Sequence, residues 1–128
     1  MTVSNDDISF EPEAECLVIR VHTRCILTDK TAAFMAIAAE LAARPIKAAL
    51  IDLREVPGPF TFMDRYQVGE AAGRYLAGTP IAAVLTEEQV DPERIGRLVA
   101  RNRGANIEVF TELGAAQAWV QKYLTPSA

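Results

Sequence analysis

The run Ala48-Ala49-Leu50-Ile51-Asp52-Leu53 decides the fold of this chain. It is apolar without interruption up to Asp52, and Pro45 and Pro57 stand on either side of it. A short apolar run between such breaks is typical of a strand that is buried on both faces. Strands of this kind belong to parallel sheets that helices cover on both faces. The run therefore predicts the centre of an α/β domain.

Outward from this run, expected strands and helices alternate along the chain. Apolar runs at 81–85 and 107–110 predict two more strands. Helical patterns predict four helices, at about 28–44, 64–77, 91–103 and 111–124. Such alternation indicates parallel strands that are joined by helical crossovers.

The N-terminal part of the chain predicts an antiparallel hairpin. Residues 8–11 and 16–22 alternate between apolar and polar side chains, and 12–15 is short enough to join two neighbouring strands. In the second strand Arg20 and His22 lie opposite the apolar side chains, which is typical of a half-buried strand. The predicted fold class is therefore α/β: one domain over residues 1–128, with a mixed sheet (a hairpin, then parallel strands) and about four helices.

Local signals predict where the helices begin and end. We expect Thr28 to cap the first helix, Asp64 to cap the second, and Asp91 to cap the third with Pro92 at its first position. Gly104 follows the third helix and can adopt the left-handed conformation that ends it.

Two of these helices also carry signals for packing. Gly69 and Gly73 lie one turn apart on the second helix and allow a neighbour to approach closely. On the third helix, Ile95, Leu98 and Val99 are the expected buried stripe.

Composition excludes several classes of protein. The chain has 128 residues, half of them hydrophobic, and a net charge of −4, which is ordinary for one globular domain. The negative charge gives no attraction to nucleic acid. The apolar stretches are too short to span a bilayer, and the acidic start is unlike a secretory signal, so we expect a cytoplasmic protein.

Cys16, His22 and Cys25 are the residues that a metal or a nucleophilic reaction would need first. Zinc sites take three or four ligands with tight local pairs, and this sequence offers one histidine and no further ligand. His22 with Cys25 lacks a third group to orient the base, so we expect His22 to be a surface residue. Both cysteines are predicted to be buried in a reducing compartment.

Charged residues at helix and strand ends give weaker signals. Arg94, Arg97 and Arg101 share one helix face, which could hold a phosphate or an acidic partner, although a solvated face is the interpretation we prefer. Asp52 ends a buried parallel strand, where open α/β sheets bind ligands. No Walker loop, Rossmann glycine pattern or nucleophile elbow is present. We expect no cofactor and no enzymatic activity.

The order of elements, together with four short sequence motifs, resembles the STAS-type family of anti-sigma-factor antagonist domains. The resemblance is narrower to the bacterial SpoIIAA-like proteins, which share their topology with CRAL-TRIO lipid-binding domains. It covers about residues 8–124. The motifs are Ala49-Leu50-Ile51-Asp52-Leu53-Arg54, Ile81-Ala82-Ala83-Val84, Ala100-Arg101-Asn102-Arg103-Gly104, and Phe110 followed by Ala118-Trp119-Val120.

The resemblance implies a regulatory or protein-interaction module. The family's switch is an Asp-Ser-Ser/Thr-Gly loop at the start of a helix, where phosphorylation breaks a partner complex. Asp64 matches the aspartate, but Arg65 and Tyr66 stand where the hydroxyls would be, so we expect no serine phospho-switch. The alternative that the topology implies is a binder of a lipid or other small apolar ligand.

Two surfaces are therefore candidate sites. A proline-rich loop at 57–66 is expected to cover the carboxyl end of the central strand as a lid or rim. The candidate ligand or interaction residues are Asp52, Arg54, Phe60, Phe62, Met63, Asp64, Arg65 and Tyr66.

The first long helix has a second apolar face. Phe34, Ile37, Ala38 and Leu41 form the stripe that should pack on the sheet. The other side could form a homodimer interface, or could be alanine tolerated in water. The candidate interface residues are Ala32, Met35, Ala36, Ala39 and Ala43.

Overall fold

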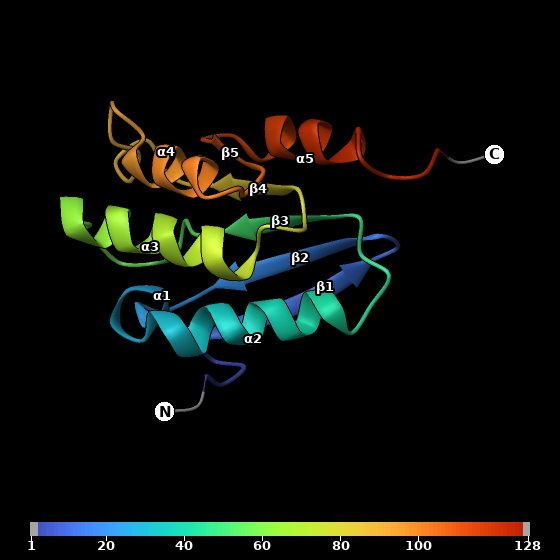
Figure 1. Cartoon of the computed structure of the whole chain (residues 1–128), viewed down its shortest axis with the longest axis horizontal. Coiled ribbons are helices and arrows are strands. Elements are labelled where there is room, and N and C mark those ends of the chain that lie inside the picture. Colours follow the sequence, from blue (N-terminus) through green and yellow to red (C-terminus); the bar gives the residue numbers. More distant parts are fainter. Residues whose placement is uncertain (1–2, 127–128) are drawn as a thin grey trace.

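The computed structural model describes residues 3–126. One five-stranded sheet, in the order β1-β2-β3-β4-β5, forms the centre of the molecule (Figure 1). β1 pairs antiparallel with β2, and the remaining pairs are parallel, so the predicted mixed sheet is confirmed. The strands are β1 (Ile8–Glu13), β2 (Cys16–Val21), β3 (Ala48–Asp52), β4 (Ile81–Val84) and β5 (Ile107–Phe110).

Helices cover the two faces of the sheet unequally. The buried side chains of α2, α3 and α4 share one hydrophobic cluster with one face, whereas those of α5 pack on the other face. Strand β3 is buried along its whole length, as its apolar sequence predicted. The helices are α1 (Cys25–Thr28), α2 (Lys30–Ala42), α3 (Phe62–Tyr75), α4 (Ile95–Asn102) and α5 (Leu113–Gln121).

The predicted cap at Thr28 is wrong. The chain first makes a single helical turn, α1, and Asp29 (φ −140°, ψ 65°) then separates it from α2. The Thr28 hydroxyl donates to the Arg24 carbonyl at 3.1 Å, so it serves the preceding turn and is not available to cap α2.

Helix α3 begins two residues earlier than expected, and Asp64 is not its N-cap. Thr61 holds that position: its hydroxyl accepts the Asp64 N–H at 3.0 Å, and the Asp64 carboxylate accepts the Thr61 N–H at 2.9 Å. This reciprocal pair is a capping box. The hydrogen bonds from Thr61 hold the pKa of Asp64 below its usual value.

Helix α4 begins later than predicted. Arg94 has a positive φ of 50°, which no right-handed helix accommodates, so a helix starting at Pro92 is interrupted. The Asp91 carboxylate still accepts the Ile95 N–H at 3.3 Å. At the other end Gly104, with φ 95°, ends the helix as expected.

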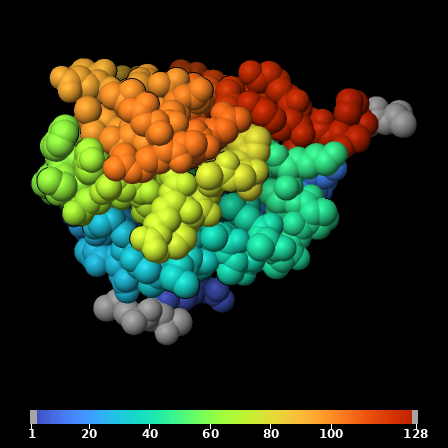
Figure 2. All heavy atoms as spheres, in the orientation of Figure 1, coloured from blue at the N-terminus to red at the C-terminus, as the bar shows by residue number. Residues whose placement is uncertain are grey.

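The close approach predicted from Gly69 and Gly73 is confirmed, and α4 is the neighbour (Figure 2). A Cβ on Gly69 would lie 2.5 Å from the Gly96 carbonyl oxygen. Since the small residues of α4 turn toward α3, Leu98 lies on the opposite side and is 50% exposed. The prediction that Leu98 is buried is therefore wrong.

Strand β2 is more buried than a half-buried strand. Leu17, Ile19 and Val21 lie in the α2–α4 cluster, while Cys16 and Val18 lie in the α5 cluster. The hairpin turn is also shorter than expected, because β1 continues through Pro12 to Glu13. A proline is tolerated there because β1 is an edge strand.

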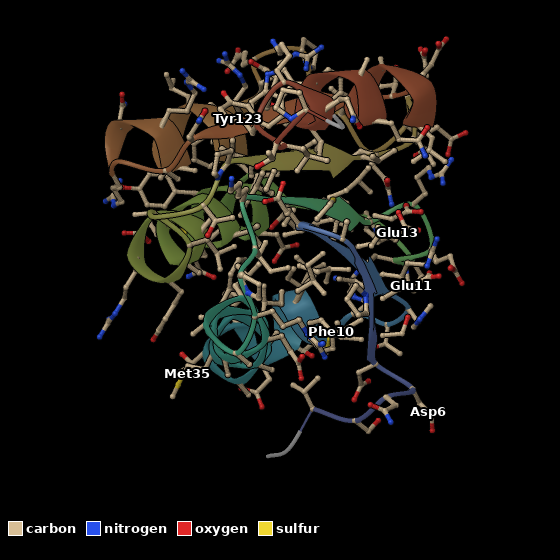
Figure 3. The ribbon with its side chains drawn as sticks, turned by 90° about the vertical axis from the view of Figure 1, so that its right-hand side faces the viewer. Asp6, Phe10, Glu11, Glu13, Met35 and Tyr123 are labelled. Carbon is tan, nitrogen blue, oxygen red and sulfur yellow. The ribbon has the colours of Figure 1, made fainter. Side chains whose placement is uncertain are left out.

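Helix α5 covers β3, β4 and β5, and leaves part of its face of the sheet open over β1 and β2. Figure 3 shows Glu11 and Glu13 on this open side and Met35 projecting from the opposite layer. None of the helices in the described part of the chain combines the length and the apolar character that a membrane span requires.

Candidate functional site

An apolar cavity of about 110 Å³ lies between α3, α4 and the carboxyl ends of the parallel strands. Its accessible lining is almost entirely hydrocarbon, and charged residues are also among those around it. Ligands bind at this end of the sheet in open α/β folds. The apolar lining includes Ile26, Leu53, Phe60, Val68, Ala83 and Leu85.

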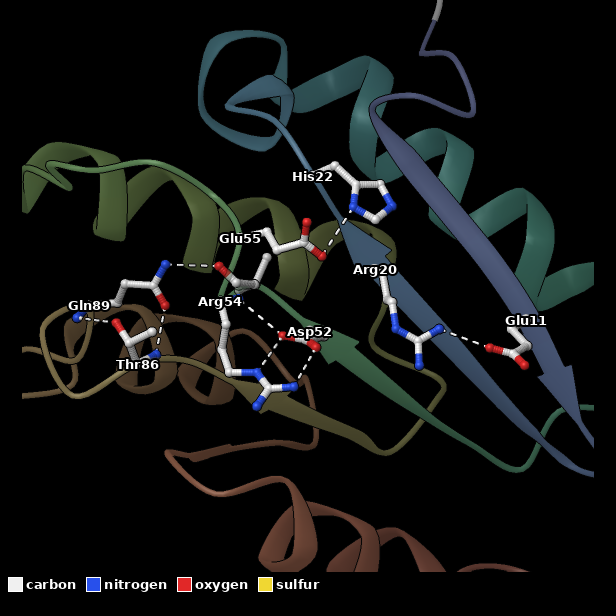
Figure 4. Close-up of polar contacts among 9 residues, drawn as sticks. Glu11, Arg20, His22, Asp52, Arg54, Glu55, Thr86 and Gln89 are labelled. Carbon is white, nitrogen blue, oxygen red and sulfur yellow. Dashed lines mark hydrogen bonds and ion pairs between the residues drawn. The ribbon is translucent and has the colours of Figure 1, made fainter.

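Two side chains hold the loop that brings Phe60 to this cavity. The Gln89 amide donates to the carbonyls of Leu53 at 2.9 Å and Val56 at 3.1 Å (Figure 4 draws the first contact). The Arg24 guanidinium donates to the carbonyls of Pro57 at 2.6 Å and Pro59 at 3.0 Å. The loop that follows β3 is therefore fastened to two other segments of the chain.

The charged residues beside the cavity are paired with one another. Arg65 donates to the Gln89 carbonyl at 3.1 Å and lies 3.7 Å from the Asp91 carboxylate. Asp91 in turn accepts the Ile95 N–H. These contacts join α3 to the segment before α4.

The residues predicted for one site fall in three places. Phe60, Asp64 and Arg65 line the cavity. Phe62 and Met63 are 59% and 55% exposed and project from the first turn of α3. Phe62 stacks on Tyr66 with ring centroids 6.4 Å apart, so the exposed aromatic surface is continuous.

Asp52 and Arg54 lie on the other face of the sheet, beside α5. The Arg54 side chain donates to both carboxylate oxygens of Asp52, at 3.0 and 2.8 Å, and the Arg54 N–H adds a third bond. Burial acts to raise the pKa of Asp52, but these hydrogen bonds and the Arg54 charge outweigh it and hold the pKa below its usual value.

The Asp52–Arg54 pair borders a groove of about 730 Å³ between α5 and the open part of the sheet. Val18 and Leu50 form its apolar floor, and Arg20 lies beside Asp52 in the strand register. Leu113 and Val120 of α5 form the opposite wall of the groove, together with Leu124, which follows the helix.

The side chains of Arg94, Arg97 and Arg101 all contact strand β5. Arg94 and Arg101 donate to the outward carbonyls of Val109 and Ile107, at 3.2 and 3.1 Å. Arg97 donates to both oxygens of Glu108, which lowers the pKa of that carboxyl. The arginine row therefore lies on the solvated helix face that we preferred, and it also joins α4 to the edge strand β5.

His22 is half-buried, and it makes two polar contacts that the sequence did not predict. Its Nε2 lies 2.8 Å from the Ser9 hydroxyl, and its Nδ1 lies 3.3 Å from the Glu55 carboxylate (Figure 4 draws the second contact). The sequence suggested only Cys25 as a nucleophile for His22, with no third group to orient the base. Glu55 is such a group, and the hairpin pairing of 8–11 with 16–22 was the signal that could have found Ser9.

Cys25 lies apart from that contact. The Thr23 hydroxyl accepts its N–H at 3.3 Å, and burial raises the pKa of its thiol. Cys16 is buried, and both cysteines are free thiols. Within residues 3–126 no group of three or more His, Cys, Asp or Glu side chains could hold a metal ion.

The candidate interface on α2 faces away from the sheet. Phe34 and Ile37 are buried beneath the helix, with Ala38 and Leu41 packed beside them. On the other side Met35, Ala39 and Ala43 are exposed, and Ala32 and Ala36 are half-buried.

Comparisons with known proteins add no assignment. No protein-family model matches the sequence, and no curated protein matches it.

Proposed function

We propose that this protein binds a small apolar ligand in the cavity between α3 and α4. The observation that carries the proposal is the cavity itself: an apolar space of about 110 Å³ at the carboxyl end of a parallel sheet. A dry apolar cavity of about 150 Å³ accepts benzene, so a single ring or a branched alkyl group is the scale of ligand expected.

The loop 57–61 would decide how the ligand enters. Phe60 is partly buried against the core, whereas its neighbours in the loop are exposed. Moving Phe60 outward enlarges the space without disturbing the sheet, so a longer apolar chain could follow the first ring or branch.

Filling the cavity tests the proposal. Benzene and indole are titrated into ¹⁵N-labelled protein, and saturable shifts are expected for amides that line the cavity. Ala83→Val removes part of the space and should abolish these shifts, whereas the matched variant Ala115→Val on the exposed side of α5 should keep them. Binding that is unchanged in Ala83→Val, or absent from the wild type, would contradict the proposal.

A second candidate function is a protein-interaction or regulatory module without a serine phospho-switch. Exposed Phe62 and Met63, with Tyr66 beside them, favour it, because large apolar side chains grouped on a surface are typical of contact sites. The resemblance to anti-sigma-factor antagonist domains supports the same function. The two free thiols favour a reducing compartment such as the cytoplasm.

The second candidate is tested by crosslinking in the protein's own cells. Replacing Phe62 and Met63 together by serine should remove a crosslinked partner, while the matched variant Met35→Ser should retain it. Loss of the partner in Ala83→Val alone would instead connect it to the cavity.

A further inference from the structure

We infer that Ser9, His22 and Glu55 form an acyl-transfer triad that hydrolyses esters on the open face of the sheet. The three side chains come from β1, the end of β2 and the loop after β3, so only the folded sheet brings them together. This activity goes beyond the proposed ligand binding, because the α3–α4 cavity lies on the opposite face.

The geometry assigns one role to each nitrogen of His22. Glu55, as a carboxylate, accepts hydrogen bonds only and lies 3.3 Å from Nδ1, so its charge favours the tautomer with the ring proton on Nδ1. Nε2 is then an acceptor, and the Ser9 hydroxyl lies 2.8 Å from it. This is the division of roles in serine hydrolases: the base faces the nucleophile with one nitrogen and the orienting carboxylate with the other.

The triad is also reachable. Ile8 and Phe10 pack into the α2–α4 cluster, so the alternation of β1 directs Ser9 to the open face. Ser9 is half-buried, and the His22 side chain is 29% exposed. A substrate can therefore approach without displacing a helix.

The surroundings provide a charge and an acyl-binding surface. Arg20 stands directly opposite Ser9 in the hairpin register. Its Nη1 donates to Glu11 at 2.8 Å, and the remaining N–H groups of the guanidinium can stabilise the oxyanion of a tetrahedral intermediate. Val18 lies two residues before Arg20 on β2, and Leu50 lies beside it on β3. These two side chains begin the apolar floor of the groove under α5. The substrate class that fits is an ester of a short- or medium-chain carboxylic acid.

The reaction balances within these groups and water. The Ser9 Oγ forms a bond to the acyl carbon as its proton passes to His22 Nε2, and the ester C–O bond breaks as that proton moves to the leaving alkoxide. Water then attacks the acyl-serine, His22 takes the proton of the water and returns it to Ser9, and the carboxylic acid leaves. Glu55 positions the imidazole and does not touch the substrate.

Hydrolysis of p-nitrophenyl butyrate tests the inference, together with labelling by a fluorophosphonate that loses fluoride to an activated serine. Wild-type protein should turn over the ester and carry one label, which peptide mapping finds on Ser9. Ser9→Ala and His22→Gln should each lower kcat/KM by about 100-fold or more. Ser4→Ala, at a serine outside the triad, should keep both activity and label.

Glu55→Gln separates a positioning role from general damage. It should lower kcat by about tenfold or more and leave KM unchanged, and adding it to Ser9→Ala should cause no further loss. Glu88→Gln, also an exposed glutamate, is the matched control, and circular dichroism melts show that each variant is folded. The inference is overturned by a label on another residue, by hydrolysis no faster than free imidazole gives, or by hydrolysis that survives in Ser9→Ala.

Discussion

Asp52 is a charged side chain among the buried residues of the sheet, and its position depends on Arg54. A buried carboxylate without a partner would lose its hydration and gain nothing in return. The three bonds from Arg54 replace that hydration and favour the ionised form. The ion pair therefore allows β3 to end with a buried charge at the border of the groove under α5.

Replacing Asp52 with asparagine should lower the free energy of unfolding by about 1–3 kcal/mol at neutral pH, since a hydrogen-bonded buried charge is removed from its partner. The folded-state pKa of Asp52 is lowered, so its contribution is complete above the unfolded value of about 3.9 and is lost as the pH falls through the folded value. Urea unfolding at pH 7 and at about pH 3 measures both effects.

The wild type should lose stability over that acid interval and Asp52→Asn should lose less. Asp6→Asn, at an exposed aspartate, serves as the control and should behave as the wild type. An acid sensitivity that is equal in the wild type and in Asp52→Asn would show that the Arg54 contact contributes nothing.

For single residues, the sequence predicted the position within a strand or helix better than the side-chain contacts. Asp52 was correctly expected at the carboxyl end of a buried strand, because the apolar run before it is unambiguous. Its bidentate bond with Arg54 depends on side-chain directions after the strand, which periodicity does not give. Glu55 was missed for a similar reason: it is ordinary in sequence, and tertiary structure alone brings it to His22. Ser9 is equally ordinary in sequence, although the predicted hairpin already placed its strand beside that of His22.

At the scale of helices and strands, the packing of α3 against α4 depends on glycine. Gly69 lies against Gly96 and Val99, and Gly73 lies against Ala100 and Arg103. The missing side chains let the two helix backbones approach each other, and this close contact determines which side of α4 is buried.

Gly69→Ala should therefore destabilise the protein by about 1–3 kcal/mol, because its Cβ would lie 2.5 Å from a backbone oxygen that cannot easily move. Gly114→Ala is the matched control, since nothing lies within 4 Å of its Cβ position in α5. It should stabilise by about 0.5–1 kcal/mol through helix propensity. Thermal melts of both variants compare the two, and a Gly69→Ala protein as stable as Gly114→Ala would contradict this account.

Helix ends were the least predictable part of each element. Thr28, Asp64 and Asp91 are all good capping residues, and the sequence offered each as the start of a helix. In the structure Thr28 bonds to the turn before it and Thr61 caps α3. Capping preferences describe what a residue can do, and neighbouring residues with the same chemistry compete for the same backbone groups.

For the whole molecule, the apolar outer face of α2 is a surface that a partner could cover. Exposed Met35, Ala39 and Ala43 face away from the sheet, and α3 is the helix beside them. We predict that this face forms a twofold homodimer interface.

Sedimentation equilibrium over a range of concentrations tests this prediction. The wild type should show a monomer–dimer equilibrium, and Ala39→Glu should shift it to monomer by placing a charge in the contact. Ala115→Glu on α5 adds the same charge elsewhere and should leave the dimer intact. A wild type that is monomeric throughout, or an Ala39→Glu protein that still forms dimers, rules out this face.

The architecture was predictable because alternation and continuous apolar runs are physical requirements of a covered parallel sheet. The hairpin, the parallel strands and the buried β3 all followed from those patterns. The strand order did not, because every order of parallel strands leaves the same local pattern in the chain. The number of helices on each face of the sheet, which creates the groove under α5, could not be predicted for the same reason.

The arginine row on α4 has a consequence for how this protein behaves in concentrated solution. Arg94 and Arg101 occupy the outward carbonyls of β5, and at the opposite edge β1 carries Pro12 between glutamates. An edge strand whose backbone N–H and C=O groups are unpaired is a template for fibril growth. These side chains hinder such pairing at both edges of the sheet. Precipitates of the native protein should therefore be amorphous, and variants without the two arginines become candidates for amyloid seeding.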